Sequence, residues 1–343
     1  MRIACLVLNN LYNGAENMVV LAAKHLTERH DVWYCSPSGP INKYLDDAGV
    51  AHVPIKKVNV KTVKNLMKTF EPDVFLVLDN KASVVCALAK VPFISYQQNN
   101  WPWIGGFNPF SLGMLYYSKR AKKVIGVSDH LINEFRFSKS IRDKYITIPN
   151  VVDLSHVKEL AGDLAETKIY DMCTIGRMAP QKSPSTFVRI VSKLAKTRPD
   201  ISAVMIGDGE LMGEVKALTE QLGVKDNITF TGFLKNPFEI MKQSKLLVMT
   251  SLYEGKSLAV IEAMSLGLPV ITSRVPGMED DIDDSCGRIC DNEEEFCAAI
   301  EEFLSDEKLY QTMSQGAKIR AQMSGDVEKY IADMEKICHE ALG

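Results

Sequence analysis

The stretch LLVMTSLYEGKSLAVIEAMSLGLPVIT, residues 246–272, contains the structural unit that repeats along this chain. It begins with the short apolar run Leu246–Met249, which predicts a buried strand. A polar loop containing Glu254-Gly255 follows, then a segment with helical period at Ser257–Leu266, and then a second apolar run at Val270–Thr272. Strand, helix and strand in this order predict two parallel strands joined by a helix that covers the sheet.

The same alternation runs along the whole chain in two series. The expected strands are Ile3–Leu8, Val32–Cys35, Val74–Leu78, Phe93–Tyr96, Val124–Val127 and Ile146–Pro149 in the first series, and Met172–Ile175, Ala203–Ile206, Ile228–Thr231, Leu246–Met249 and Val270–Thr272 in the second. Helices are expected at Ala15–Arg29, Val63–Phe70, His130–Phe137, Ser185–Lys196, Leu211–Leu222, Ser257–Leu266 and Glu293–Leu304. This pattern predicts an α/β protein with two doubly wound parallel sheets.

The boundary between the domains is expected where the apolar period is weakest, in residues 153–168. We place the first domain at residues 1–160 and the second at 161–325. A last helix, residues 326–343, has no strand after it, and one place for it is back on the first domain. Two such domains are expected to bind ligands at the carboxyl ends of their strands, in a cleft between them.

The composition is that of an ordinary globular protein, with 46% apolar and 24% charged residues. No window of 18 apolar residues predicts a membrane-spanning helix, and the apolar run at Ile3–Leu8 is better explained as a strand than as a leader peptide. The eight cysteines contain no C-x-x-C pair, so we expect reduced thiols and a cytoplasmic protein. No Cys/His group has the spacing of a structural zinc site.

The two parts of the chain differ in charge. Residues 1–153 hold 19 Lys and Arg against 12 Asp and Glu, whereas the rest holds 21 against 31. This asymmetry predicts either different partners for the two parts or nothing beyond chance. The basic residues Lys56, Lys57, Lys61, Lys64, Lys68, Lys119, Arg120, Lys122 and Lys123 could rest on the anionic inner face of a membrane, and the alternative is a solvated basic surface. No nucleic-acid partner is expected.

Two loops that follow strands carry groups suited to phosphate. In residues 9–16, Gly14 could let backbone amides approach an anion, although one glycine is also typical of a plain turn. There is no G-x-G-x-x-G motif, so a dinucleotide cofactor is not expected. In the second loop, Arg177 and Lys182 are five residues apart before a helix that Ser183 could cap. Two cations there suit a diphosphate, and the alternative is a pair of surface charges.

Two further loops add glycines and carboxylates. Residues 207–210, Gly-Asp-Gly-Glu, allow close backbone approach or form a tight turn. In the fourth loop, Glu254 precedes the helix start, where free amides could hold a phosphate. Glu262 lies further along that helix among apolar residues. A buried carboxylate needs a partner, which could be the paired hydroxyls of a ligand or a buried cation.

Together these loops resemble the retaining family-4 glycosyltransferases of GT-B fold, of the bacterial polysaccharide-assembly type. The resemblance rests on Gly-Arg with Lys five residues on, on Ile-Gly-Asp-Gly, and on two glutamates within an S-x-x-E-G…E-A-M-x-x-G-x-P-V frame. Supporting positions are Gly14-Ala15-Glu16, Ile148-Pro149-Asn150 with Asp153, Phe230-Thr231-Gly232-Phe233 and Pro276-Gly277-Met278-Glu279. The motifs of the second domain are the specific ones, and those of the first domain are few.

The resemblance implies transfer of a hexose or N-acetylhexosamine from a nucleotide-diphosphate donor, with a UDP-sugar as the first expectation. The anomeric configuration would be retained, and no metal or other cofactor would be needed. Arg177 and Lys182 would stabilise the leaving diphosphate, and Glu254 would contact the donor sugar. The donor would also meet Gly14, Ala15, Gly176, Gly207, Phe233, Leu234, Gly255, Lys256, Ser257, Leu258 and Glu262, the last through the ribose hydroxyls. The acceptor would be a glycan, including one on a polyprenyl diphosphate, in capsule or lipopolysaccharide assembly.

The sequence departs from the family in two places. Many relatives carry a histidine where this chain has residues 97–100, Gln-Gln-Asn-Asn, which form hydrogen bonds but cannot act as a general base. Lys256-Ser257 stands where relatives often have a large apolar residue and a proline, so the identity of the donor sugar is not fixed by this motif. We expect Asn99, Asn100, Trp101 and Trp103 to contact the acceptor. Asp281-Ile282-Asp283 resembles a metal-binding D-x-D, but its place in an acidic surface run predicts a structural role.

Two other functions fit the same motifs. One is a GT-B sugar-nucleotide epimerase, and the other is an inactive GT-B protein that serves as a binding or scaffolding subunit. Arg177, Lys182, Glu254 and Glu262 are all present, which argues against the scaffold because a scaffold does not need a diphosphate site.

Overall fold

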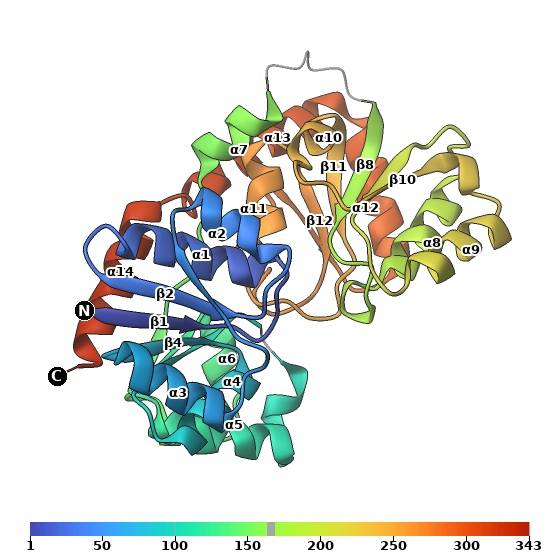
Figure 1. Cartoon of the computed structure of the whole chain (residues 1–343). Coiled ribbons are helices and arrows are strands. Elements are labelled where there is room, and N and C mark those ends of the chain that lie inside the picture. Colours follow the sequence, from blue (N-terminus) through green and yellow to red (C-terminus); the bar gives the residue numbers. More distant parts are fainter. Residues whose placement is uncertain (100, 163–168, 343) are drawn as a thin grey trace. The chain divides into compact units, whose positions relative to one another are not determined.

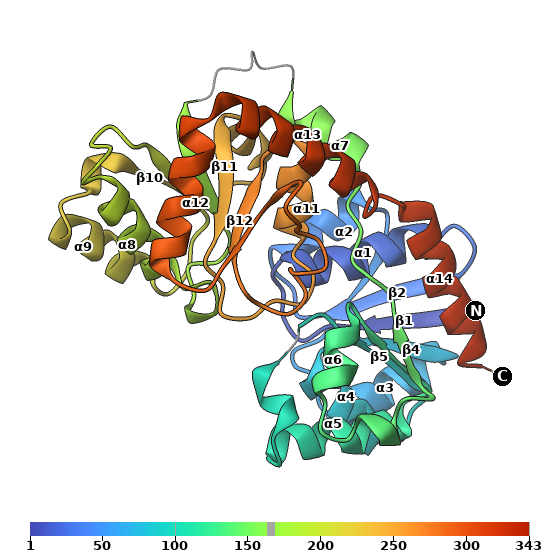
Figure 2. The same ribbon diagram turned by 180° about the vertical axis from the view of Figure 1, so that it is seen from behind.

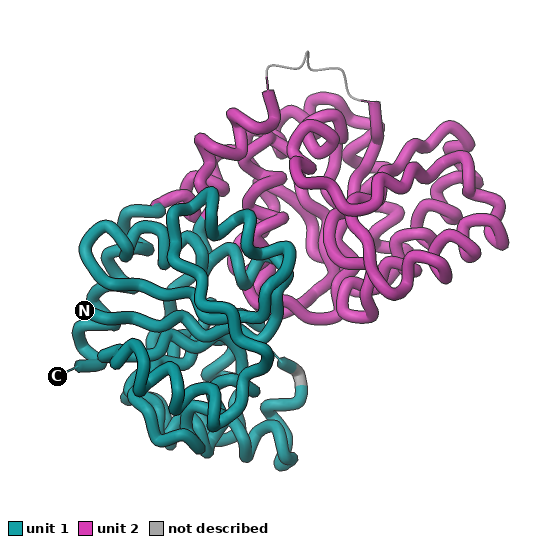
Figure 3. Tube along the Cα trace, in the orientation of Figure 1, with its two compact units in different colours: residues 1–151, 327–343 teal, residues 152–326 magenta. Residues whose placement is uncertain are grey.

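The computed structural model describes residues 1–99, 101–162 and 169–342, which form two compact units. Unit 1 contains residues 1–151 and 327–343, and unit 2 contains residues 152–326 (Figure 3). The boundary lies before helix α7 (Leu154–Ala161), not after it as the sequence indicated. Helix α7 belongs to unit 2 because it packs on helices α10 (Phe238–Lys242) and α11 (Leu258–Ser265).

Unit 1 is built on a seven-stranded parallel sheet in the order β3-β2-β1-β4-β5-β6-β7. Its strands are β1 (Arg2–Leu6), β2 (Asp31–Ser36), β3 (Ala51–Pro54), β4 (Val74–Leu78), β5 (Phe93–Gln97), β6 (Lys123–Gly126) and β7 (Tyr145–Thr147). Every residue of the central strand β4 is buried, as expected when helices cover both faces of a parallel sheet.

The helices of unit 1 cover this sheet as Figure 1 shows. They are α1 (Gly14–Leu26), α2 (Ile41–Asp47), α3 (Val60–Phe70), α4 (Asn80–Ala89), α5 (Pro109–Arg120), α6 (Asp129–Glu134) and α14 (Val327–Glu340), with short 3-10 turns at Pro102–Gly105 and Ser138–Ser140. Helix α4 packs between α3 and α5. The chain returns from unit 2 to unit 1 in α14, which packs beside α1 (Figure 2). There the Tyr330 hydroxyl donates a hydrogen bond to the Met18 carbonyl at 3.0 Å.

Unit 2 has a six-stranded parallel sheet in the order β10-β9-β8-β11-β12-β13. Its strands are β8 (Tyr170–Ile175), β9 (Ala203–Ile206), β10 (Ile228–Gly232), β11 (Ser244–Met249), β12 (Val270–Ser273) and β13 (Gly287–Cys290). Its remaining helices are α8 (Pro184–Leu194), α9 (Met212–Gln221), α12 (Glu293–Ser305) and α13 (Glu307–Gln322), with 3-10 turns at Pro180–Lys182 and Lys225–Asn227. One apolar core lies against α8 and α12, and a second lies against α11 and α13.

Each sheet has one place where the strand order reverses direction. In unit 1 it lies between β1 and β4, and in unit 2 between β8 and β11. At such a switch point the loops after the two strands diverge to opposite faces, which leaves a crevice at the carboxyl ends where ligands bind. The sheet topology therefore selects the loops after β8 and β11, and those after β1 and β4, as the places to examine.

The sequence analysis predicted the α/β fold correctly. Every expected strand forms, with ends within two residues of the prediction. The edge strands β3 and β13 were missed because neither Ala51–Pro54 nor Gly287–Cys290 is a continuous apolar run. The cysteines are free thiols, and none of the described helices is long and apolar enough to cross a membrane.

Candidate active site

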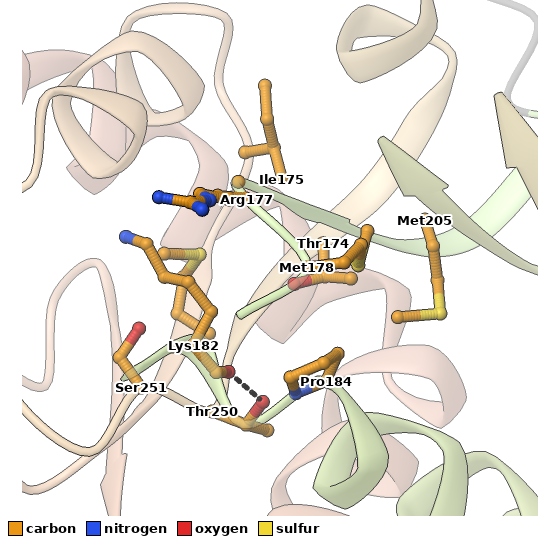
Figure 4. Close-up of a pocket in the computed structure, with 11 residues that line it drawn as sticks. Thr174, Ile175, Arg177, Met178, Lys182, Pro184, Met205, Thr250 and Ser251 are labelled. Carbon is orange, nitrogen blue, oxygen red and sulfur yellow. Dashed lines mark hydrogen bonds between the residues drawn. The ribbon is translucent and has the colours of Figure 1, made fainter. Parts of the chain in front are cut away.

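The loops that follow β8 and β11 form a small hollow at the switch point of unit 2. The two strands are hydrogen-bonded neighbours, so their loops leave the sheet side by side. Gly176, Arg177 and Lys182 line the hollow from the β8 loop, and Thr250 and Ser251 line it from the β11 loop (Figure 4). This arrangement places both expected phosphate-binding cations at one edge of the sheet.

Lys182 and Glu254 form an ion pair across the switch point. The Lys182 ammonium contacts Oε1 of Glu254, and the two side chains are 24% and 8% exposed. Glu254 is therefore a buried carboxylate whose neutralising partner is a lysine that still reaches solvent. An anion entering the hollow would compete with Glu254 for that lysine, and Glu254 would become free to accept hydroxyl donors.

Backbone hydrogen bonds hold these two loops in a fixed register. The Leu252 amide donates to the Gln181 carbonyl at 2.8 Å, and the Gln181 side chain donates to the Tyr253 carbonyl at 2.9 Å. The Thr250 hydroxyl lies within 3.2 Å of the Lys182 carbonyl and 3.1 Å of the Ser183 carbonyl (Figure 4). The buried Ser251 hydroxyl has no hydrogen-bond partner within the described part of the chain.

The Gly-Asp-Gly loop after β9 packs directly on the β8 loop. A Cβ on Gly207 would lie 2.0 Å from the Gly176 carbonyl oxygen, and one on Gly209 would lie 2.5 Å from the Met178 carbonyl oxygen. Gly207 also has φ of +130°, a conformation that favours glycine. These glycines are therefore explained by close approach of two backbones, which positions the segment containing Arg177.

A second glycine contact supports the Glu254 loop. Gly277 has φ of +90°, and a Cβ on it would lie 1.5 Å from the Gly255 carbonyl oxygen. The loop after β12 thus fixes the backbone that presents Glu254. The sequence singled out both segments, but only the structure shows that one supports the other.

Gly277→Ala is expected to destabilise the protein by about 1–3 kcal/mol. Alanine is strained at the positive φ of residue 277, and its methyl group would push the Gly255 carbonyl away. Nucleotide binding should weaken more than the loss of fold explains, because the Glu254 loop moves. Thermal unfolding and nucleotide titration measure the two effects. Gly213→Ala is the control, since a Cβ there meets no atom within 4 Å. Equal behaviour of the two variants would contradict the supporting role.

Lys256 forms an ion pair with a carboxylate of its own unit. Its ammonium lies 2.6 Å from Oδ1 of Asp281, and the two side chains are 13% and 8% exposed. We expected Asp281 to have a structural role within an acidic surface run. The surface position was wrong, because Asp281 is 6% exposed. Its contact with Lys256 is an ion pair within the fold. Burial raises the pKa of Asp281, which the adjacent Lys256 charge opposes.

Glu262 lies in α11 with apolar neighbours, and no donor among the described residues pairs with its carboxylate. Burial raises its pKa from the ordinary 4.5 to about 7. The buried ion pair that the sequence allowed as an alternative is therefore not formed within the described chain. At neutral pH the carboxylate is poised between its charged and neutral forms, and a pair of hydroxyl donors would favour the charged form.

The remaining expected donor residues lie around this edge. Arg177 is 62% exposed and pairs with Glu210 at 3.0 Å, so it can exchange this partner for a phosphate. Phe233 is 66% exposed, whereas Leu234 packs on the core. The sequence suggested that Ser183 could cap α8, but its side chain makes no capping hydrogen bond among the described residues and instead bonds the Thr186 hydroxyl at 2.9 Å.

The start of α11 lies in a buried segment, with Ser257 7% and Leu258 8% exposed. Ser257 occupies the N-cap position before Leu258, and within the described residues its side chain makes no capping hydrogen bond. The first amides of a helix that lacks such a cap remain available to an anion, which the helix dipole also favours.

In unit 1, Gly14 and Ala15 begin helix α1 after β1. The Asn9 side chain donates to Oε1 of Glu16 at 2.7 Å and accepts from the Leu11 amide at 3.0 Å, so the loop is internally bonded.

Asp79, after β4, is a residue that the sequence analysis missed. It has φ of +77° without being glycine, a strained conformation that is more frequent at functional sites. Its Oδ1 accepts the amides of Lys81 and Ala82. Burial and the charge of Glu16 raise its pKa to about 6 against the effect of those amides. The signal in the sequence was only its position directly after a buried strand.

The expected acceptor residues follow β5. Asn100 lies outside the described residues, and Asn99 is partly buried. The rings of Trp101 and Trp103 are 4.9 Å apart, and Trp103 packs on Phe110 at 5.7 Å. The aromatic groups therefore form a cluster at the start of α5, where Phe110 itself is 64% exposed.

Models of known protein families match this chain. The family model described as Glycosyl transferases group 1 matches residues 133–320, and the model described as Glycosyltransferase Family 4 matches residues 12–156. The two matches together extend over both units.

Several curated proteins are similar in sequence. An uncharacterized glycosyltransferase of Methanocaldococcus jannaschii is 28% identical over 68% of this chain, which spans 57% of that protein's length. The N-acetylgalactosamine-N,N'-diacetylbacillosaminyl-diphospho-undecaprenol 4-alpha-N-acetylgalactosaminyltransferase of Campylobacter jejuni is 26% identical, with 77% and 69% of the two chains covered. The UDP-Gal:alpha-D-GlcNAc-diphosphoundecaprenol alpha-1,3-galactosyltransferase of Escherichia coli is 27% identical, with 71% of each chain covered.

Solved structures share the fold. Anabaena Alr3699/HepE, crystallised in complex with UDP, has a TM-score of 0.82 at 18% identity, covering 98% of this chain and 99% of that one. A glycosyltransferase from Rickettsia africae has a TM-score of 0.82 at 19% identity, covering 99% and 98%. At this identity the likeness establishes the fold and leaves the ligands of this chain to its own residues.

Proposed function

This chain belongs to the glycosyl transferases of group 1, and we propose that it moves a hexose or N-acetylhexosamine from a UDP-sugar to a glycan acceptor with retention of configuration. It is a glycosyltransferase of GT-B type, with two parallel-sheet units. The observation that carries the finer proposal is the Lys182–Glu254 pair at the switch point of unit 2, with Arg177 beside it.

In the proposed reaction the bond between the anomeric carbon and the donor phosphate oxygen breaks. The acceptor hydroxyl oxygen forms the new bond on the same face, and its proton passes to the departing phosphate, which leaves as UDP. Lys182 and Arg177 stabilise the charge that develops on the diphosphate. Glu254, released from Lys182 by the diphosphate, accepts hydrogen bonds from the donor sugar. No step in this proposal uses a metal ion.

Two neighbouring features would hold the rest of the donor. The start of α11, which lacks a side-chain cap within the described residues, offers backbone amides to a phosphate. Glu262 offers its carboxylate to the ribose hydroxyls. The Ser251 hydroxyl in the hollow is a further donor or acceptor for the diphosphate. For Gly14, Ala15, Phe233 and Leu234, contact with the donor stays a prediction.

The acceptor is proposed to be a glycan carried on a polyprenyl diphosphate. Two relatives are named for acceptors of this kind, and one of them is named for UDP-Gal as its donor. On this chain, Trp101, Trp103 and Asn99 offer ring faces and an amide that suit sugars. Asp79 adds a carboxylate at the switch point of unit 1 that can accept a sugar hydroxyl.

A panel of nucleotide sugars tests the proposal by thermal shift, since a bound donor raises the unfolding temperature by mass action. The stabilising donor is then incubated with and without lipid-linked glycans. We expect UDP to be released in step with product only when the acceptor is present. An epimerase would convert the donor without acceptor, and an inactive scaffold would bind it without release, so either outcome would overturn the proposal.

We also propose that unit 1 rests on an anionic membrane surface, which would present the lipid-linked acceptor. Phe107 and Phe110 are 69% and 64% exposed beside α5, and Arg136 lies over the Phe107 ring. Lys61, Lys64 and Lys68 are exposed along α3, which packs on α4 as α5 does. Lys123 contributes less than expected, because it pairs with Glu340 at 2.8 Å. Exposed aromatic and basic groups together are typical of interfacial binding.

The double substitution Phe107→Ser with Phe110→Ser is expected to lower binding to vesicles containing phosphatidylglycerol more than tenfold. Burying each apolar ring in the membrane contributes about 1.5–3 kcal/mol to the free energy of binding. Sedimentation at two salt concentrations measures it. Ile319→Ser, which removes an exposed apolar residue from unit 2, is the control and should change nothing. Salt-insensitive or absent vesicle binding by the unmodified protein would refute this surface.

A further inference from the structure

Three side chains with metal-ligand chemistry meet on unit 1, away from the loops described above. Among the residues that the structure describes, His30, Glu335 and His339 each offer one ligand atom, and these atoms lie within 4.8 Å of one another. His30 is 305 positions from Glu335 in the sequence, so no spacing motif reveals the cluster.

The secondary structure explains why these residues converge. Glu335 and His339 are four residues apart on α14, so they point from the same face of the helix. His30 lies in the turn between α1 and β2, against which α14 packs. Its Nε2 is 2.8 Å from Oε1 of Glu335, and its ring meets the His339 ring edge to face at 5.9 Å between centroids.

The surroundings orient these groups. Arg29 lies 3.2 Å from the other oxygen of Glu335, Oε2, and its side chain is 72% exposed. The amino terminus lies 3.4 Å from Nδ1 of His30. Both positive groups repel a cation. However, they contact Oε2 of Glu335 and Nδ1 of His30, whereas the facing ligand atoms are Oε1 and Nε2.

We propose that His30, Glu335 and His339 bind a divalent transition-metal ion of the Zn²⁺ type, which fastens α14 to unit 1. Two imidazoles and one carboxylate form a ligand set that Zn²⁺ accepts at about 2.0–2.2 Å, with water in the fourth position. Small side-chain rotations bring the three atoms to these distances. Nε2 of His30 binds the ion in the neutral ring tautomer that carries its proton on Nδ1, so no proton remains between Nε2 and Glu335, and Arg29 stays on Oε2 as an outer hydrogen-bond partner.

The position of the cluster gives the ion a structural consequence. Helix α14 is the segment by which the chain returns to unit 1 after unit 2, and its inner face, including Tyr330, Met334 and Cys338, is buried there. An ion that binds the folded state and not the unfolded chain shifts the folding equilibrium by mass action. At a free concentration 100 times Kd, the shift is about 100-fold in favour of the folded protein.

Isothermal titration of the full chain, without an affinity tag and after dialysis against EDTA, tests the proposal with ZnCl₂ alone. We expect one ion per chain and a higher unfolding temperature with Zn²⁺ than with EDTA. His339→Ala removes an exposed ligand and should weaken binding at least tenfold while circular dichroism stays unchanged. Glu335→Gln should weaken it similarly, and Co²⁺ should show the absorption of a four-coordinate site in the unmodified protein only.

His25→Ala is the matched control, because His25 also lies beside a glutamate on unit 1, at 3.5 Å from Glu28, but outside the cluster. It should bind Zn²⁺ like the unmodified protein. Three results would overturn the inference: no binding at 100 times the protein concentration, equal binding by His339→Ala, or equal weakening by His25→Ala. None of these readouts depends on the transferase reaction, so failure here leaves the proposed function standing.

Discussion

Replacing Lys182 with alanine is expected to lower kcat by about 10²–10³-fold, the effect of removing one charged group that stabilises a developing anion. Lys182 lines the hollow at the switch point and contacts Glu254, which is only 8% exposed. The substitution therefore removes the stabilising charge and also leaves a buried carboxylate unpaired. We expect a loss of about 1–3 kcal/mol in unfolding free energy, which leaves the protein folded. Steady-state UDP release and thermal unfolding measure the two effects.

Two variants separate catalysis from stability. Lys193→Ala removes another ion-paired lysine of unit 2, which lies on α8 and contacts Glu293 and Glu294 of α12, and it should leave kcat unchanged. Combining Lys182→Met with Glu254→Gln removes both charges, so it should recover stability relative to Lys182→Ala without recovering turnover. An unchanged kcat in Lys182→Ala would sink the role that we assign to this residue.

Glu262→Gln is expected to stabilise the protein without ligand while weakening nucleotide binding. The pKa of Glu262 is raised by burial from 4.5 to about 7. Below pH 4.5 the group is protonated in both the folded and unfolded chain and costs nothing. As pH rises from 4.5 to 7 the unfolded chain releases the proton first, so stability falls, by up to about 3 kcal/mol above pH 7. Glutamine removes this cost and should stabilise the protein at pH 8 but not at pH 4.

Nucleotide binding should respond in the opposite direction. If the carboxylate accepts the ribose hydroxyls, the ionised form binds best, so UDP affinity should rise with pH through about 7 in the unmodified protein. In Glu262→Gln the affinity should be about tenfold lower, and its pH dependence in this range should be smaller. Denaturant unfolding and UDP titration at pH 4, 7 and 8 test both signs. Glu214→Gln, on exposed α9, is the control. Parallel changes in stability and affinity would contradict a binding role for Glu262.

Much of the fold could be predicted from the sequence because its signals are local. A parallel strand buried on both faces must be an apolar run, as in Val74–Leu78, and the expected strands all form. The edge strands Ala51–Pro54 and Gly287–Cys290 are not continuous apolar runs, so they were missed. The boundary at residue 160 was also wrong, because the position of α7 depends on its packing against α10 and α11 rather than on its own period.

The residues that we propose for the donor site were also named from the sequence, since each lies in a segment that follows a predicted strand. What the sequence did not show is how these residues pair. It left Glu262 with two explanations, and it treated Asp281 as a surface residue although it is buried against Lys256. The strained Asp79 was not distinguishable from any residue after a strand.

The sequence by itself thus determined the α/β architecture, the family and the chemical groups available at the ends of the strands, because apolar period and loop composition are properties of neighbouring residues. Only the tertiary structure decided which of these groups meet. Strand order, not chain order, places Lys182 beside Glu254. The return of the last helix places His30 beside Glu335 and His339. Contacts between distant residues depend on how the elements pack, and that packing is spread over the whole core rather than recorded in any single stretch.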